Sequence, residues 1–293
     1  MRAEAKTPDW RIGVIGGSGL YDFAGLEDAQ EIAVSSPFGE PSAPVTMGRI
    51  GHVHFVFLPR HGKGHRIAPE AINARANIDV LKRCGVTDVL AISAIGSLRE
   101  DLAPGSFVAV DQFIDRTHGR TDSFFGEGLV AHVSMADPVC SQLSGFAANA
   151  AEAAGAVVHR GGCYLAMQGP QFSTRAESRM YRQWGADVIG MTALPEARLA
   201  REAELPYALL GMVTDYDSWR EGEHVEVADV MRVMAGNTAL ARNTLLQLAQ
   251  LLPVERIGSP IDCSLDGAIM TAPAQRNPVL VAKLGAIAGR VLG

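Results

Sequence analysis

The sequence predicts a single α/β domain, in which a central twisted, mixed β-sheet is flanked by helices on both faces. Two observations carry this expectation. Short apolar segments of strand length alternate with segments whose apolar residues recur at helical spacing, most regularly between residues 175 and 213. No linker or change of composition interrupts the chain before Pro253. We therefore treat residues 1–293 as one domain, with its core at about residues 10–252 and an irregular arm and helix at residues 253–293.

Composition narrows the classes of partner. The 293 residues carry a net charge of −6, and the pI near 5.8 argues against nucleic acid or an anionic membrane. The chain begins with no signal-peptide pattern and has no apolar run of about 18 residues, so we expect a cytoplasmic protein. The cysteines are widely spaced, suggest no metal site and are expected to be reduced, mostly buried thiols: Cys84, Cys140, Cys163 and Cys263.

In the N-terminal half, the first expected strand ends in the glycine-rich turn Gly16-Gly17-Ser18-Gly19. Two later strands are expected to form a hairpin around Gly51-His52, and Pro69 is suited to open a helix that runs to Gly85. Two more strands are expected after this helix, at residues 88–93 and 106–114, and the first of them is expected to end at Ser93-Ala94. The expected strands are residues 11–15, 45–50, 53–58, 88–93 and 106–114.

In the C-terminal half, apolar residues between Val227 and Leu252 keep a three-to-four spacing that predicts one long amphipathic helix. An irregular arm at residues 254–274 and a short helix at about residues 278–292 complete the chain. Shorter helices are expected at residues 139–153, 175–184 and 196–203, and strands at residues 157–159, 162–167, 187–191 and 207–213.

Asp215 and Asp217 follow directly after the buried strand expected at residues 207–213. Ligands of open α/β sheets bind beyond the carboxyl ends of strands, which is where these paired acids are expected. One carboxylic acid of such a pair can donate a proton to a leaving group while the other orients it. The alternative is a solvated turn, since aspartate is common in turns.

Donors suited to an oxyanion occur at four expected strand ends. At one end, Arg60 can bind an oxyanion with two hydrogen bonds, and its neighbour His61 can add one more. The other three ends offer hydroxyls or free backbone amides, at Ser18, Ser93-Ala94 and Thr192. Each alone is as well explained by local structure. Together they predict one phosphate pocket. The Gly16–Gly19 turn has neither the glycine spacing of a dinucleotide fingerprint nor the Gly-Lys-Ser/Thr ending of a P-loop.

Several motifs follow one another in an order that resembles a known family. They include IGVIGGSGLYDF, SSPFGEPS, LPRHGKGH, DQFIDRT, QGPQFSTRAES and TDYDSW. This order resembles the 5′-methylthioadenosine phosphorylases, which belong to the trimeric branch of the purine nucleoside phosphorylase family. The resemblance runs from about Arg11 to Leu252, weakens between Gly119 and His132, and is nearly absent beyond Pro253. It implies a nucleoside phosphorylase-like fold.

The resemblance also implies site residues and an assembly. Phosphate is held by Ser18, Arg60, His61, Ser93, the Ala94 amide and Thr192. The nucleoside contacts are Met191 at the ribose, Phe172 and Ser173 at the purine, the base-reading segment Asp215-Tyr216-Asp217, and Val227 and Val230 at the methylthio group. His132 matches a residue that reaches into a neighbouring subunit of a homotrimer. Gln168 departs from the glutamate that many relatives carry near the ribose.

The implied reaction is phosphorolysis of 5′-methylthioadenosine to adenine and 5-methylthioribose 1-phosphate, a step of purine and methionine salvage. Inorganic phosphate is the co-substrate, and we expect no cofactor and no metal. Asp217 is the expected acid at N7, and Asp215 the partner of the exocyclic amine. Three alternatives stay open: a phosphorylase of 6-oxopurine or mixed nucleosides, a non-catalytic nucleoside-binding protein and, more remotely, a dinucleotide-dependent oxidoreductase.

Overall fold

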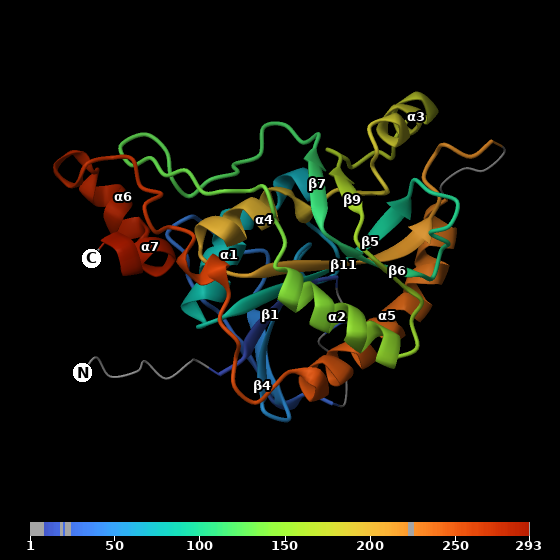
Figure 1. Cartoon of the computed structure of the whole chain (residues 1–293), viewed down its shortest axis with the longest axis horizontal. Helices are drawn as coiled ribbons and strands as arrows, with labels where there is room; N and C mark the ends of the chain where they lie inside the picture. Colours follow the sequence, from blue (N-terminus) through green and yellow to red (C-terminus); the bar gives the residue numbers. More distant parts are fainter. Residues whose placement is uncertain (1–8, 18–19, 21–24, 222–225, 293) are drawn as a thin grey trace.

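A computed structural model describes residues 9–17, 20, 25–221 and 226–292, and its eleven strands in these ranges form one mixed sheet (Figure 1). The strands in chain order are β1 (Arg11–Gly16), β2 (Glu27–Ile32), β3 (Val45–Ile50), β4 (Val53–Pro59), β5 (Asp88–Ser97), β6 (Phe107–Val110), β7 (Gln112–Asp115), β8 (Val158–Arg160), β9 (Cys163–Ala166), β10 (Val188–Gly190) and β11 (Tyr207–Asp215). The α/β class expected from the sequence is confirmed.

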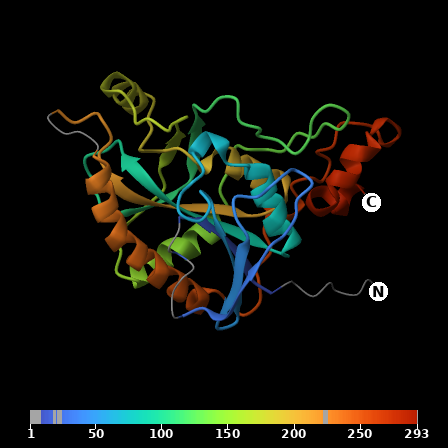
Figure 2. The same cartoon turned by 180° about the vertical axis from the view of Figure 1, so that it is seen from behind.

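Helices cover both faces of the sheet. One face packs against α1 (Ala74–Arg83), α4 (Ala193–Glu202) and α7 (Gly285–Leu292), and the other against α2 (Ser141–Ala153) and α5 (Val227–Leu251). Viewed from behind, α5 runs along the face opposite α1 (Figure 2). The remaining helices are α3 (Arg175–Gln183), beside the end of the sheet, and α6 (Pro278–Lys283), with short 3-10 turns at Pro69–Ala71, Pro260–Cys263 and Pro273–Gln275.

The central strands explain why the layers form. Along β5, Val89 and Ala91 pack with one helical layer, while Leu90 and Ile92 pack with the other. Successive side chains of a strand point to opposite faces, so a strand buried on both sides must be apolar throughout. β11 follows the same rule, and its first eight residues are buried. This double burial fixes the register of β5 and β11.

The two edges of β5 are used differently, and this difference creates a gap in the sheet. β11 pairs with β5 in parallel along residues 89–96. On the other edge, β1 pairs only as far as Ala91, and β10 joins only at Gly96 and Ser97. Among the described strands, none pairs with residues 93–95 on that edge. Backbone groups there are available to side chains or a ligand.

Several expected elements differ from the structure. β5 continues to Ser97, so Ser93 and Ala94 lie beside the gap and not at a strand end. The strand expected at residues 106–114 breaks at Asp111, because β6 pairs with β11 and β8 while β7 pairs with β9. The helix expected from Pro69 begins at Ala74, where the Asn73 side chain accepts the Ala76 N–H at 3.1 Å. The single C-terminal helix is two helices, α6 and α7.

Two further observations concern whole-chain expectations. Within the described ranges, no helix has both the length and the apolar composition needed to cross a membrane. All four cysteines are free thiols; Cys84 and Cys140 are buried, Cys163 is half-buried and Cys263 is exposed.

Candidate functional site

The gap in the sheet gathers predicted oxyanion donors from three segments. Continuing the antiparallel register of β10 beyond Gly190 places Thr192 opposite Ser93, and their hydroxyl oxygens lie 3.5 Å apart. Arg60 follows β4, and its Nη1 donates to the Ser93 hydroxyl at 2.9 Å. The Ile92 carbonyl faces the same gap, since it lies 3.4 Å from Arg60 Nη1. Backbone groups alternate along a strand, so the Ala94 N–H also faces the gap.

Arg60 is held in place by a buried carboxylate. Its Nε donates to Glu196 Oε2 at 2.9 Å and its Nη2 to Oε1 at 3.0 Å, and both side chains are almost completely buried. The hydroxyl of Tyr207 donates to Glu196 Oε1 at 3.0 Å. Burial opposes the charge of Arg60, but the Glu196 carboxylate outweighs it and the pKa of Arg60 lies above its usual value. The guanidinium is therefore a fixed positive charge with Nη1 directed into the gap.

His61 is a neutral imidazole in this arrangement. Burial lowers its pKa to about 4, and the Arg60 charge and His65 act in the same direction. Its Nδ1 lies 2.9 Å from the Ile67 carbonyl, and because a carbonyl only accepts, Nδ1 carries the hydrogen. Nε2 is then an acceptor. The donor role expected for His61 therefore requires a protonated ring, because the neutral ring offers only an acceptor at Nε2.

The Met191-Thr192 segment is anchored by a residue that the sequence interpretation missed. Arg120 donates from Nη1 to the carbonyls of Met191 at 2.6 Å and Leu194 at 2.9 Å, and from Nη2 to that of Gln168 at 2.7 Å. Thr192 makes no side-chain cap bond at the start of α4, so its hydroxyl remains available beside Ser93. Gln168 itself accepts the His118 N–H through Oε1 at 3.0 Å.

Asp215 and Asp217 lie at the carboxyl end of β11, as the sequence predicts. Asp215 accepts at both oxygens, from the Thr214 hydroxyl at 2.7 Å and from the Asp217 N–H at 2.8 Å. Asp217 is 4% exposed, and its φ of 47° lies in the left-handed region. Burial raises the pKa of both carboxyls, against hydrogen bonds that lower it. Asp215 is half-buried, and a pair of carboxyls with raised pKa values is suited to hold a proton, unlike a solvated turn.

Gly96 allows the two acids to sit against β5. A Cβ at this position would lie 3.0 Å from Asp215 Oδ1 and 3.5 Å from the Asp217 Cβ. Trp219, two residues beyond Asp217, donates its Nε1–H to the Ser97 carbonyl at 2.8 Å. The loop that carries Asp215 and Asp217 is therefore held against β5, the strand that also carries Ser93. β5 thus connects the oxyanion donors with the two acids.

Other predicted site residues lie near this region or apart from it. Ser173 is buried and Phe172 is 44% exposed, just before α3. Val227 is 65% exposed and Val230 half-buried in the first turn of α5. Tyr216 contacts Arg220 and Trp219, and its hydroxyl donates to the Glu100 carbonyl at 3.4 Å, so it braces the loop. Ser18 lies outside the described residues.

His132 lies away from the acids of its own chain. It is exposed, and its backbone N–H donates to the Ala268 carbonyl of the C-terminal arm at 2.9 Å. The neighbouring Ala131 forms a bridge with Ile269. The helices α6 and α7 lie at the opposite end of the molecule from the carboxyl end of β11 and the start of α5 (Figures 1 and 2).

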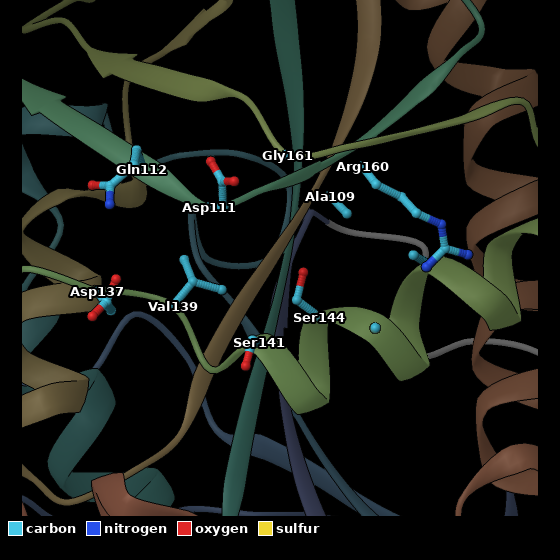
Figure 3. Close-up of a pocket in the computed structure, with 11 residues that line it drawn as sticks. Ala109, Asp111, Gln112, Asp137, Val139, Ser141, Ser144, Arg160 and Gly161 are labelled. Atoms are coloured by element: carbon cyan, nitrogen blue, oxygen red, sulfur yellow. The ribbon is translucent and has the colours of Figure 1, made fainter.

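One cavity among the described residues lies elsewhere. It has a volume of about 550 Å³ and lies between the start of α2 and the ends of β6 and β8 (Figure 3). Two of its charged side chains already hold hydrogen bonds: Asp111 Oδ1 accepts the Gly162 N–H at 3.0 Å, and Arg160 donates to Asn149 and Glu152 at 2.7 Å. None of the predicted site residues that the structure describes lines it. The chemistry therefore points to the gap and not to this cavity.

Comparison with known proteins identifies the family. Residues 11–249 match the phosphorylase superfamily. The S-methyl-5′-thioadenosine phosphorylase of Bradyrhizobium diazoefficiens is 55% identical over 284 residues, which cover 96% of this chain and 98% of that protein. A methylthioadenosine phosphorylase from an antarctic soil metagenomic library has a similar structure, with a TM-score of 0.90, 41% identity and coverage of 94% and 98%. The Schistosoma mansoni enzyme in complex with adenine gives a TM-score of 0.83 and 37% identity, covering 89% of this chain and 99% of that one.

Proposed function

The chain belongs to the phosphorylase superfamily, and from this membership we propose that it catalyses phosphorolysis of 5′-methylthioadenosine to adenine and 5-methylthioribose 1-phosphate. One structural observation supports this reaction above all. Arg60, Ser93 and Thr192 meet at the gap in the sheet, and β5 connects that gap to the half-buried Asp215 and the buried Asp217. An oxyanion site joined to a proton donor is what the reaction requires.

Phosphate binds at the gap. Arg60 supplies a charged donor, Ser93 and Thr192 supply hydroxyls, and the Ala94 amide supplies a neutral donor. Ser18, from the glycine-rich turn, completes the set. Neutral His61 accepts the P–OH hydrogen through Nε2, and the charge of a bound phosphate raises the tendency of His61 to protonate. The site thus favours the dianion HPO₄²⁻, which carries one P–OH hydrogen.

The bond from C1′ to the purine nitrogen breaks as positive charge develops on the sugar. The negative phosphate stabilises that charge and then forms the new C1′–O bond. The electrons of the broken bond pass to the purine, and Asp217 delivers a proton to N7. Asp215 accepts from the exocyclic amine of adenine. Both roles need carboxyls shielded from water, and the burial that raises their pKa values supports this.

Adenine is favoured over a 6-oxopurine because the two bases present different groups beside N7. The amine of adenine donates, whereas the oxygen of a 6-oxopurine accepts. An ionised Asp215, with both oxygens receiving hydrogen bonds, is an acceptor and matches the amine. A 6-oxopurine would leave buried acceptors facing each other, which is the kind of mismatch that gives strong discrimination.

The 5′ end of the nucleoside lies against the start of α5, and a second chain closes it. Val227 and Met231 are 65% and 63% exposed there, and exposed apolar side chains of this kind fit a methylthio group or a subunit boundary. His132 is exposed to solvent and contacts the C-terminal arm, at the opposite end of the folded molecule from the start of α5. We assign His132 to the site of a neighbouring subunit in a homotrimer.

The proposal is tested by measuring base release from 5′-methylthioadenosine, adenosine, 5′-methylthioinosine and inosine, each with phosphate. We expect kcat/KM to be highest for 5′-methylthioadenosine, with the two 6-oxopurine nucleosides at least about 100-fold lower. Arg160→Ala, which removes an exposed arginine that lines the cavity beside α2, should leave this order unchanged. A preference for inosine would contradict the proposed substrate and favour the 6-oxopurine alternative.

A further inference from the structure

Ser178 connects α3 to the acid pair and has not been given a role so far. It lies in the middle of α3, is fully buried, and donates its hydroxyl hydrogen to Oδ2 of Asp217. The two residues are 39 positions apart. A buried hydroxyl paired with the proposed acid across two elements is a specific contact, since a serine in a helix usually bonds to its own helix backbone.

The Ser178 hydroxyl is itself held from the other side. The Ser218 N–H donates to Ser178 Oγ at 3.3 Å, and this leaves the hydroxyl hydrogen free to point at Asp217. Asp215 is different, because its oxygens receive only local donors, from Thr214 and from the Asp217 backbone. Asp217 is therefore the member of the pair whose side chain another element orients.

α3 is docked by contacts that do not depend on this hydroxyl. The Arg182 guanidinium lies 3.7 Å from the centre of the Trp219 ring, and Arg175 Nε donates to the Ser218 carbonyl at 3.3 Å. Thr174 and Glu177 form a capping box at the start of α3. Removing the hydroxyl should consequently leave α3 in place, so its effect on the reaction can be measured in a folded protein.

We propose that Ser178 is a positioning residue: its hydroxyl holds Oδ2 of Asp217 and thereby directs the other carboxyl oxygen toward N7 of the departing purine. The assignment rests on the proposed function. Ser178 touches neither phosphate nor nucleoside in this scheme and acts through Asp217. Because Phe172 and Ser173 directly precede the same helix, α3 sets both the residues beside the base and the direction of the acid.

The contact predicts a specific pH dependence. Burial raises the pKa of Asp217, hydrogen bonds from Ser178, the Ser218 N–H and the Ser173 hydroxyl lower it, and the Asp215 carboxylate raises it. Tyr181, from α3, is the other titratable group beside Asp217. The reaction needs protonated Asp217, so kcat/KM falls as pH rises through the Asp217 pKa. Loss of the Ser178 donor raises that pKa, and the alkaline limb moves to higher pH.

The test is the pH profile of kcat/KM for Ser178→Ala, with thermal unfolding of the same protein. We expect the alkaline limb to move up by about one pH unit and the maximal kcat to fall about tenfold, with little change in KM. Thr244→Val is the matched control, because Thr244 is equally buried but donates only to the Leu240 carbonyl of α5. The Thr244→Val variant should keep the pH profile of kcat/KM that the parent protein shows.

Two further measurements check the same contact independently. Ser178→Cys keeps a similar side-chain volume but is a weaker hydrogen-bond donor, so the alkaline limb of its pH profile should move in the same direction by a smaller amount. Binding of adenine and 7-deazaadenine, which lacks the N7 acceptor, reports the contact without catalysis; Ser178→Ala should narrow the ratio of their Kd values severalfold. An unmoved limb and an unchanged Kd ratio in folded Ala and Cys variants would overturn the role of Ser178. A parent protein without phosphorolysis would instead reject the proposed function.

Discussion

At the residue scale, the candidate site depends on charges that are buried and paired. Arg60 and Glu196 are 2% and 3% exposed, and each is the main charged partner of the other. Breaking a buried ion pair from one side leaves a charge without compensation, which costs far more than losing a surface pair. Sequence inspection singled out Arg60 but not Glu196, because a glutamate at the start of a helix is ordinarily a surface residue.

Glu196→Gln should weaken phosphate binding and stability together. The amide cannot balance the Arg60 charge, so we expect the phosphate KM to rise about tenfold and the free energy of unfolding to fall by about 3 kcal/mol. Chemical denaturation and initial rates at varied phosphate measure both. Glu152→Gln, which breaks the exposed pair with Arg160, should change stability by less than about 0.5 kcal/mol. An unaltered phosphate KM would show that Arg60 needs no such partner.

Asp217→Asn should change base preference as well as rate. An amide cannot protonate N7, so kcat for 5′-methylthioadenosine should fall far more than binding does. Asn also offers a donor to N7 and O6 of a 6-oxopurine, so the kcat/KM ratio should shift toward 5′-methylthioinosine by at least about tenfold, or about 1.4 kcal/mol. Asp215→Asn should have a smaller effect on kcat. Full adenine activity with an unchanged ratio would mean that the acids only stabilise the loop.

At the scale of elements, the sequence predicts helices and strands that have a clear apolar periodicity. It misses features that depend on pairing between strands far apart in the chain. The double-sided burial of β11 made that strand and its terminal acids recognisable. The extension of β5 to Ser97 depends on β10 joining its far end, which no local pattern records. β2 was not expected, because all six of its residues are exposed and it is held by pairing with β3.

The same distinction applies to the site. Arg60, Ser93 and Thr192 were proposed as one pocket from their positions after apolar strands, and the structure brings these three together. Glu196, Ser178 and Arg120 act through contacts with residues far away in the chain, and their own surroundings in the sequence are unremarkable. Ser178 lies within the motif QGPQFSTRAES, but the motif alone does not identify a hydrogen-bond partner for its hydroxyl.

α4 also fixes the segment before His132, and this contact should make stability depend on pH. Glu202, at the end of α4, accepts the Ser123 hydroxyl and the Phe124 N–H, each at 2.7 Å. Burial raises its pKa to about 7, and Asp122 adds to the effect. The folded state therefore holds a proton that the unfolded state releases near pH 4.5, so this residue lowers stability as pH rises toward 7.

Glu202→Gln should remove that dependence. Between pH 5 and pH 8, the parent should lose about 2.5 kcal/mol more unfolding free energy than the variant, as measured by urea denaturation at each pH. Glu127→Gln changes an exposed glutamate of the same segment and should follow the parent. Parallel curves for parent and Glu202→Gln would show that Glu202 is ionised throughout this range.

At the scale of the whole molecule, apolar side chains are exposed beside the proposed site. The start of α5 exposes Val227 and Met231, while His132 lies at the end of the molecule that carries the C-terminal arm. An apolar surface beside a reaction that must exclude water is best explained by a second chain. A homotrimer with cyclic symmetry allows each chain to give His132 to one neighbour and receive it from the other.

Shared sites predict complementation between two inactive variants. Asp217→Asn and His132→Ala homotrimers should each be impaired in turnover of 5′-methylthioadenosine. In mixed trimers, some sites combine the intact Asp217 of one chain with the intact His132 of another, so co-expressed chains should be more active than either variant alone. Sedimentation should give a particle of three 31.1-kDa chains. An active monomer, or no gain on mixing, would rule out the shared site.

The central claim is that phosphate, and not water, receives the sugar. ³¹P spectroscopy of the protein with 5′-methylthioadenosine and inorganic phosphate tests it directly. We expect a new phosphomonoester resonance that grows in step with adenine, one for one, and no adenine when phosphate is left out. Adenine released at an undiminished rate without phosphate, together with free 5-methylthioribose, would make the protein a hydrolase and contradict the account.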